Sequence, residues 1–187
     1  MRTRFNTSIY SNKGMGLEED INITNKYYLD SDIAVIYKKP TAVTIHKAEY
    51  PAPHEAIIKE AYFKTPSTTD YNGIYKGKYI DFEAKETKSK TSFPLSNIHQ
   101  HQIEHLKRIT RHGGIGFVIV RFVSLNETYI LFEKDLVDYI ENNDRKSIPY
   151  EYFKEKGYLI KEKYAPRLNY LEIVDKYGGI LWQRRKT

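Results

Sequence analysis

The amino-acid sequence predicts an α/β fold with a mixed central β-sheet flanked by helices. Segments with helical spacing of apolar residues are interleaved along the chain with short β-branched segments. Turn-forming residues separate several of these segments. The 187 residues, 40% of them hydrophobic, are enough to bury one core. We therefore expect a single domain over residues 1–187.

The N-terminal part of the chain contains three predicted segments. Residues 1–14 are polar and basic, which is typical of a flexible arm able to hold phosphates. Apolar residues recur at helical spacing over residues 17–28, so we expect an amphipathic helix there. Residues 33–37 form a short β-branched strand that ends before Pro40.

Two extended segments are predicted next, over residues 43–50 and 57–63, on either side of the proline-rich turn Tyr50–Pro53. They carry many polar, basic and aromatic side chains, namely His46, Lys47, Lys59, Tyr62, Phe63 and Lys64. Such a pair of strands does not suit a buried core. We expect a hairpin that protrudes from the domain and is suited to contact DNA.

A strand with strict alternation of polar and apolar residues is predicted over residues 79–87. Successive side chains of a strand point to opposite faces. Asp81, Glu83 and Lys85 therefore share one face, and the apolar residues between them pack on the other.

Turn signals before this strand predict a hairpin. They lie at Asn72-Gly73 and at residues 76–78. Asp70 precedes both of them. A hairpin of this length brings Asp70 next to Glu83.

The second half of the chain continues the interleaving of helices and strands. Residues 97–112 are predicted to form a helix that ends at Gly113-Gly114. Apolar strands follow over residues 115–123 and 128–132. We expect a mixture of helices in the remainder, with a basic tail at residues 184–186.

Asp70, Glu83 and Lys85 are the residue types that phosphodiester hydrolysis requires. Two carboxylates offer hard oxygen ligands to Mg²⁺, which polarises a phosphate and acidifies a bound water. A neighbouring amine orients that water or stabilises the negative charge of the transition state. The alternative is that Glu83 and Lys85 are an ordinary solvent-facing pair, which is the commoner origin of a bare E-x-K pattern, and that Asp70 forms a turn.

Gln102 is a polar residue in the apolar stripe of helix 97–112, which also contains Ile98, Leu106 and Ile109. A buried amide needs hydrogen-bond partners. Its carbonyl oxygen either caps a loop, which the residues alone favour, or binds a metal or a metal-bound water. The four histidines of this region fall on several helix faces without a Cys or an H-E-x-x-H pattern, so we reject a zinc site.

The composition indicates a nucleic-acid partner and excludes several classes of protein. A net charge of +6 attracts polyanions, and 17 tyrosines supply surfaces for base stacking, although a basic charge also serves solubility alone. The absence of cysteine excludes disulfides and thiolate zinc sites. Because no signal segment or membrane-spanning run is found, we expect a cytoplasmic protein without a membrane partner.

Taken together, these residues resemble the RecU Holliday junction resolvases of Gram-positive bacteria, which belong to the PD-(D/E)xK nuclease superfamily. The likeness runs from about Tyr10 to Tyr170. It rests on five stretches, Leu17–Asp20, Thr24–Tyr28, Ile58–Lys64, Ser67–Gly77 and Tyr79–Thr87.

The resemblance implies a restriction-endonuclease-like fold and a homodimer that resolves four-way junctions by symmetric paired nicks during recombination and repair. The implied cofactor is Mg²⁺, for which Mn²⁺ can substitute. The implied metal ligands are Thr68, Asp70, Glu83 and Gln102, and Lys85 is implied to stabilise the transition state.

DNA contacts are implied at several further positions. The resemblance implies that the protruding hairpin is a β stalk over about residues 44–66 that enters the centre of the junction. On this stalk, Tyr62 and Phe63 are expected to contact opened bases, with Lys64 beside them, and Lys38 is expected to contact the backbone. Lys13 stands where the family pattern has Arg, so the charge is kept but the bidentate fork is lost.

Other points stay open at the level of the sequence. RecA and RuvAB are partners by resemblance alone. Helical spacing leaves Glu18 and Glu19 both beside the apolar stripe of the first helix, so either can reach the metal through a water. A different PD-(D/E)xK nuclease that cuts duplex DNA, or a non-catalytic DNA-binding module, is the alternative function.

Overall fold

The structure is a computed structural model that describes residues 16–41, 43–52, 54–63 and 68–178. The predicted basic arm with Lys13, residue Lys64 and the basic tail lie outside the described residues. In chain order the elements are α1 (Leu17–Asp30), β1 (Val35–Lys38), β2 (Val43–Ala52), β3 (Glu55–Phe63), β4 (Tyr71–Tyr75), β5 (Lys78–Thr87), β6 (Ser92–Pro94), α2 (Gln100–Arg111), β7 (Ile115–Phe122), β8 (Glu127–Phe132), α3 (Glu133–Glu141), β9 (Ser147–Pro149), α4 (Tyr150–Lys156), β10 (Tyr158–Leu159) and α5 (Tyr170–Ile173).

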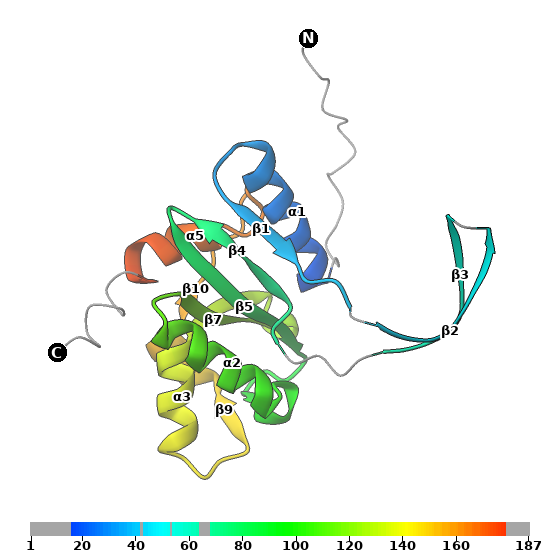
Figure 1. Cartoon of the computed structure of the whole chain (residues 1–187). Coiled ribbons are helices and arrows are strands. Elements are labelled where there is room, and N and C mark those ends of the chain that lie inside the picture. Colours follow the sequence, from blue (N-terminus) through cyan, green and yellow to red (C-terminus); the bar gives the residue numbers. More distant parts are fainter. Residues whose placement is uncertain (1–15, 42, 53, 64–67, 179–187) are drawn as a thin grey trace.

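A six-stranded mixed sheet forms the centre of the domain, in the order β1-β4-β5-β7-β8-β10. Strands β5 and β7 run parallel, and the other neighbouring strands run antiparallel. Helices α1 and α5 pack on one face, whereas α2, α3 and α4 pack on the other (Figure 1). The predicted α/β class with a mixed sheet flanked by helices is confirmed.

The two faces of the sheet bury separate apolar clusters, and the side chains of β5 alternate between the two faces. On the α1 face, Phe82 stacks between Tyr71 and Phe117, with ring centroids 4.9 and 4.8 Å apart. The neighbouring residue Glu83 pairs with Val118, which belongs to the cluster on the α2 face. Glu83 is therefore directed toward the α2 layer, because side chains alternate along the strand.

The β4–β5 hairpin corrects one sequence prediction. Its turn is at Lys76-Gly77, both of which have positive φ angles, as a tight hairpin turn requires. Asn72-Gly73 was predicted as a turn but lies inside β4 and pairs with both β1 and β5. Glycine is needed there because a Cβ on Gly73 would lie 2.1 Å from the Val35 carbonyl oxygen.

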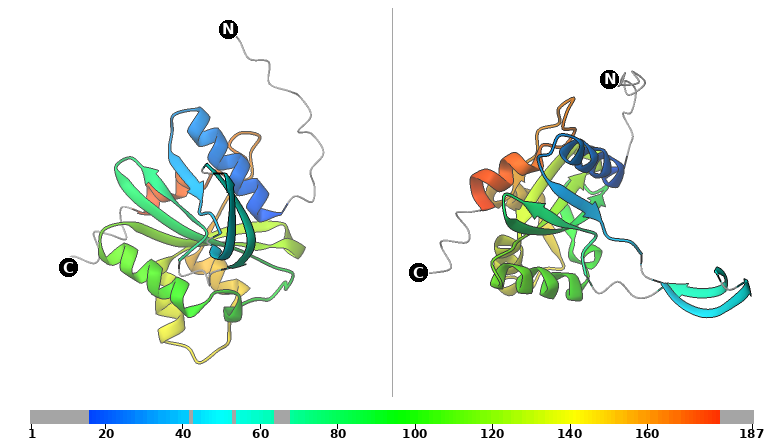
Figure 2. Two further views of the ribbon diagram at one scale, coloured as in Figure 1. Left: turned by 45° about the vertical axis from the view of Figure 1, so that its right-hand side comes forward. Right: turned by 45° about the horizontal axis from the view of Figure 1, so that its top comes forward.

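Strands β2 and β3 pair with each other in a separate two-stranded sheet. This stalk extends away from the body of the domain, as Figures 1 and 2 show from three directions. It carries exposed apolar and aromatic side chains, namely Val43, Ile45, Tyr50, Ile57, Ile58 and Tyr62. The predicted protruding β stalk is confirmed.

The region after β8 is less helical than predicted. Strand β9 pairs with β6, and β10 forms an edge of the central sheet. These strands contain three and two residues, which is too short to show a period-two pattern in a sequence. Among the described residues, no helix is both long and apolar enough to cross a membrane.

Candidate active site

The register of the β4–β5 hairpin brings Asp70 to Glu83. Tyr71 pairs with Phe82, so the residue before Tyr71 lies beside the residue after Phe82. The backbone N–H of Asp70 donates to Glu83 Oε2 over 3.1 Å, and the two carboxyl groups are also within hydrogen-bonding reach. The proximity predicted from the sequence is confirmed.

Glu83 is a fully buried carboxyl group with an unusual environment. Its side chain is 0% exposed, and its Oε1 lies 2.5 Å from the ammonium nitrogen of Lys85, which is 27% exposed. Burial, followed by the hydrogen bond with Asp70, raises the pKa of Glu83 to about 7, although Lys85 acts in the opposite direction. The amine therefore does not fully balance the two acids.

A cavity of about 230 Å³ opens beside Asp70 and Lys85, whereas Glu83 is buried behind them and does not line it. It is lined by the start of α1 and by both strands of the hairpin, through Gly16, Leu17, Glu18, Asp70, Tyr71, Ala84, Lys85 and Glu86. Glu18 lines the cavity and its Oε1 lies 2.5 Å from Lys38 Nζ. Of the two first-turn glutamates that the sequence left open, Glu18 is thus the one at the cavity.

The donor set of this site fits a hard divalent cation. Asp70 and Glu83 place two carboxyl groups close together, and burial is the largest cause of the raised pKa of Glu83, followed by the hydrogen bond with Asp70. Mg²⁺ keeps several waters and needs few protein ligands. Among the described residues, no group of three or more His, Cys, Asp or Glu side chains is placed to hold a metal ion.

The two remaining ligand candidates differ in what surrounds them. Thr68 is half-buried in the segment that leads into β4. Gln102 is buried on α2, and its Oε1 accepts the backbone N–H of His99 over 2.9 Å, so it caps the helix. A carbonyl oxygen has two lone pairs, and capping leaves one of them available.

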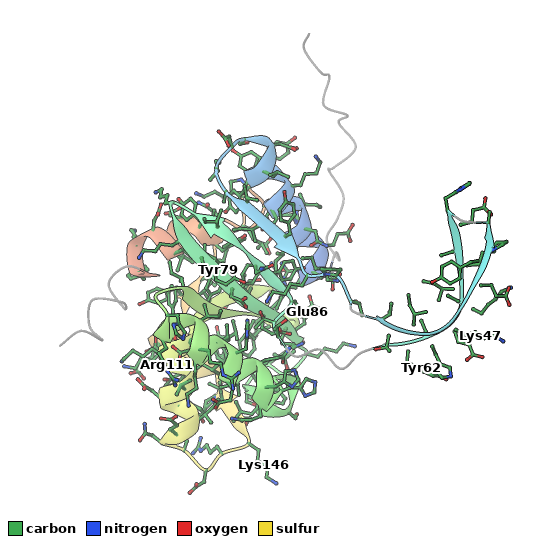
Figure 3. All side chains as sticks on the ribbon, in the orientation of Figure 1. Lys47, Tyr62, Tyr79, Glu86, Arg111 and Lys146 are labelled. Atoms are coloured by element: carbon green, nitrogen blue, oxygen red, sulfur yellow. The ribbon has the colours of Figure 1, made fainter. Side chains whose placement is uncertain are left out.

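The candidate DNA contacts lie apart from this cavity or at its edge. Tyr62 is 62% exposed on the stalk, and Figure 3 shows it with Lys47 well away from Glu86. Lys38 is half-exposed and paired with Glu18. Phe63 ends β3, but its side chain, like the whole of Lys13 and Lys64, lies outside the described part of the chain.

Sequence reasoning did not assign a role to Asp81. The structure buries it completely and surrounds it with Lys39, Thr69, Tyr79 and His105. The alternation of β5 indicated that Asp81 shares a face with Glu83. Its burial depends on α2 and on the segments beside β4, which a local pattern does not reveal.

Comparisons with known proteins agree with the resemblance found in the sequence. The family model described as Recombination protein U matches residues 12–176. A Holliday junction resolvase RecU of Geobacillus sp. strain WCH70 is 56% identical over 89% of this chain and 85% of its own length. That of Bacillus cereus strain B4264 is 53% identical over 93% of this chain and 88% of its own length.

A solved structure of Archaeoglobus fulgidus Hjc, described as a Holliday junction resolvase, gives a TM-score of 0.45 at 12% identity, over 76% of this chain and 93% of Hjc. The family model spans nearly all of the described residues, and the relatives are more than half identical over most of their length. The chain therefore belongs to the Recombination protein U (RecU) family.

Proposed function

We propose that this chain is a Mg²⁺-dependent endonuclease that resolves Holliday junctions by paired nicks. The observation that carries the proposal is that buried Glu83 accepts the Asp70 N–H and pairs with Lys85, and that Asp70 and Lys85 both line one cavity. The relatives named as Holliday junction resolvases share more than half of their residues with this chain. Their names supply the substrate that the geometry alone leaves open.

Asp70 and Glu83 would hold the metal, with Thr68 and the free lone pair of Gln102 as further oxygen donors. When bound, Mg²⁺ would polarise the scissile phosphate and acidify a water. Lys85 lies within reach of the same space, and its ammonium group would stabilise the negative charge that develops on the phosphate in the transition state. Glu83 must lose its proton before it can act as a ligand.

The stalk supports a branched rather than a linear substrate. Its described charged side chains are two lysines, Lys47 and Lys59, and three glutamates, Glu49, Glu55 and Glu60. The described part of the stalk therefore has no excess of positive charge with which to bind phosphates. Its exposed apolar and aromatic residues suit unstacked bases. Such bases are accessible at the centre of a four-way junction.

The proposal also includes the oligomeric state, the biological context, the partners and the location of the protein. Paired nicks on two strands need two active sites, which a homodimer with a two-fold axis supplies. Roles in recombination and repair, contacts with RecA and RuvAB, the substitution of Mn²⁺ for Mg²⁺ and a cytoplasmic location remain predictions from the sequence. A duplex-cutting nuclease on the same scaffold is the second candidate, and the exposed aromatic stalk argues against it.

A nicking assay tests the proposal. Labelled four-way junction and linear duplex of the same sequence are incubated with the protein in Mg²⁺ or in EDTA. We expect cleavage of the junction in Mg²⁺, none in EDTA, and none by Asp70→Asn or Glu83→Gln, which should still bind the junction in a gel shift. Glu151→Gln, an exposed acid on α4, is the matched control and should cleave normally.

Equal cutting of both substrates would favour the duplex nuclease. An inert wild-type protein would favour a DNA-binding module without catalysis.

A further inference from the structure

Asp81 is a buried carboxylate that binds donors from several directions. Its side chain is 0% exposed. Oδ2 lies 2.8 Å from Lys39 Nζ and accepts the Tyr79 hydroxyl over 3.1 Å. Oδ1 accepts the hydroxyl of Thr69. A buried carboxylate is stable when it is paired and hydrogen-bonded in this way.

Two of these partners belong to the two ends of the stalk. Lys39 follows β1, where the chain enters the stalk, and Thr69 precedes β4, where the chain returns from it. Lys39 Nζ also donates to Thr69 Oγ1 over 2.9 Å, and its backbone N–H donates to the Asp70 carbonyl over 2.7 Å. The incoming and outgoing chains of the stalk are therefore joined through Asp81.

The same carboxylate reaches α2. Its Oδ2 lies 3.1 Å from His105 Nε2, and His105 stands one turn after Gln102 on that helix. Asp81 lies two residues before Glu83, so the two side chains are neighbours on the same face of β5. It thus contacts every segment that carries a candidate ligand: the strand of Glu83, the loop of Thr68 and Asp70, and the helix of Gln102.

A two-stranded hairpin is marginally stable alone, so the stalk relies on its root for its orientation. That root is also the segment that places Asp70 beside Glu83. Residues 39 and 69 lie between the stalk and strands β1 and β4, so a movement of the stalk on DNA reaches the central sheet through them. Asp81 is the point on the sheet at which both residues are held.

We propose that Asp81 is a positioning residue that ties both strands of the stalk to the active-site strand and sets the position of Asp70. It does not touch the scissile phosphate or the metal. Seating of the stalk on DNA would then be coupled to the geometry of the metal ligands. This inference rests on the proposed function, and its test separates the two.

The test compares Asp81→Asn with wild type in four measurements: junction affinity, cleavage rate, the Mg²⁺ concentration that gives half-maximal rate, and hydrogen exchange of the amides of residues 68–71. We expect junction affinity to change by less than about threefold. The half-maximal Mg²⁺ concentration should rise by about tenfold or more, as for other groups that orient metal ligands. The exchange of the Asp70 amide, measured without metal, should become faster.

Asp175→Asn is the matched control. Asp175 also binds a lysine and a tyrosine, with Lys76 Nζ at 2.8 Å and Tyr75 OH at 2.8 Å, but at the opposite end of the same hairpin. A merely structural acid that binds this hairpin would lower the unfolding temperature without changing the Mg²⁺ dependence. We expect that result for Asp175→Asn.

Lys39→Met and Thr69→Val provide a second route if Asp81→Asn does not fold. Each should raise the half-maximal Mg²⁺ concentration, and the double variant should be less affected than the sum of the two predicts, because both act through one carboxylate.

The inference is overturned if wild type cleaves the junction while Asp81→Asn keeps the wild-type Mg²⁺ dependence and amide exchange. If Asp81→Asn does not fold, the same result for both Lys39→Met and Thr69→Val overturns it. A wild-type protein that cleaves nothing would overturn the proposed function instead. The exchange measurement would still report whether Asp81 holds residues 68–71.

Discussion

Glu83→Gln should stabilise the metal-free protein at alkaline pH although it removes the central acid of the site. Burial and the contact with Asp70 raise the pKa of Glu83 from 4.5 to about 7. The folded protein therefore binds this proton more tightly than the unfolded chain does. At pH values between these two pKa values, the folded state carries more protons than the unfolded state, so the free energy of unfolding falls as pH rises.

The size of the effect follows from the shift in pKa. A difference between 4.5 and about 7 corresponds to at most about 3 kcal/mol. This contribution is fully present below pH 4.5 and is lost once the pH exceeds 7. Glutamine has nearly the same shape, keeps an oxygen for the Asp70 N–H, and does not ionise. The Glu83→Gln protein should therefore lack this part of the pH dependence.

Urea unfolding in EDTA at pH values from 5 to 8 measures the effect. We expect Glu83→Gln to exceed wild type in free energy of unfolding at pH 8, and the difference to shrink toward pH 5. Added Mg²⁺ at one hundred times Kd should stabilise wild type by about 2.7 kcal/mol and so remove most of the difference. The reasoning is refuted if Glu83→Gln in EDTA at pH 8 is no more stable than wild type. Glu151→Gln should show no pH-dependent difference.

Three further predictions follow from the hairpin, the amine and the stalk. Gly73→Ala should lower the free energy of unfolding, measured in urea, by about 3 kcal/mol or more, because its Cβ would lie 2.1 Å from the Val35 carbonyl oxygen. The control is Gly16→Ala, whose Cβ would meet open space. Lys85→Met should slow junction cleavage by about 10² to 10³ with little change in gel-shift affinity, and a normal rate would exclude it from the chemistry. Tyr62→Ala should weaken junction binding by about 1–3 kcal/mol if its exposed ring stacks on a base; unchanged selectivity for junction over duplex would exclude that contact.

The local features of the site could be predicted from the sequence because they depend on short-range geometry. Strand alternation placed Asp81, Glu83 and Lys85 on one face, and the hairpin placed Asp70 beside Glu83. The error at Asn72-Gly73 arose because an Asn-Gly pair usually forms a turn. Here the close approach of β1, a long-range contact, selects glycine inside a strand.

Contacts between residues that are far apart in the sequence could not be predicted from local patterns. Asp81 meets Lys39 and His105, which are 42 and 24 residues away. A sequence pattern shows that such residues exist but not that they converge. The role of Thr68 came from the family resemblance alone. For Gln102 the residues left a cap and a metal ligand open and favoured the cap, which the structure shows; the family resemblance favoured the metal ligand.

Asp81 and Glu83 show why two acids on one strand face can have different tasks. Both are buried, but Asp81 is balanced by Lys39, His105 and two hydroxyl groups, whereas Glu83 has one amine and faces a second acid. The protein satisfies the first acid internally and leaves the second short of positive charge. In EDTA at pH 8, Asp81→Asn should therefore destabilise the protein by leaving the partly buried ammonium group of Lys39 without its carboxylate partner, while Glu83→Gln should stabilise it. Opposite signs in one experiment would identify Asp81 as part of the scaffold and Glu83 as a group completed by a cation.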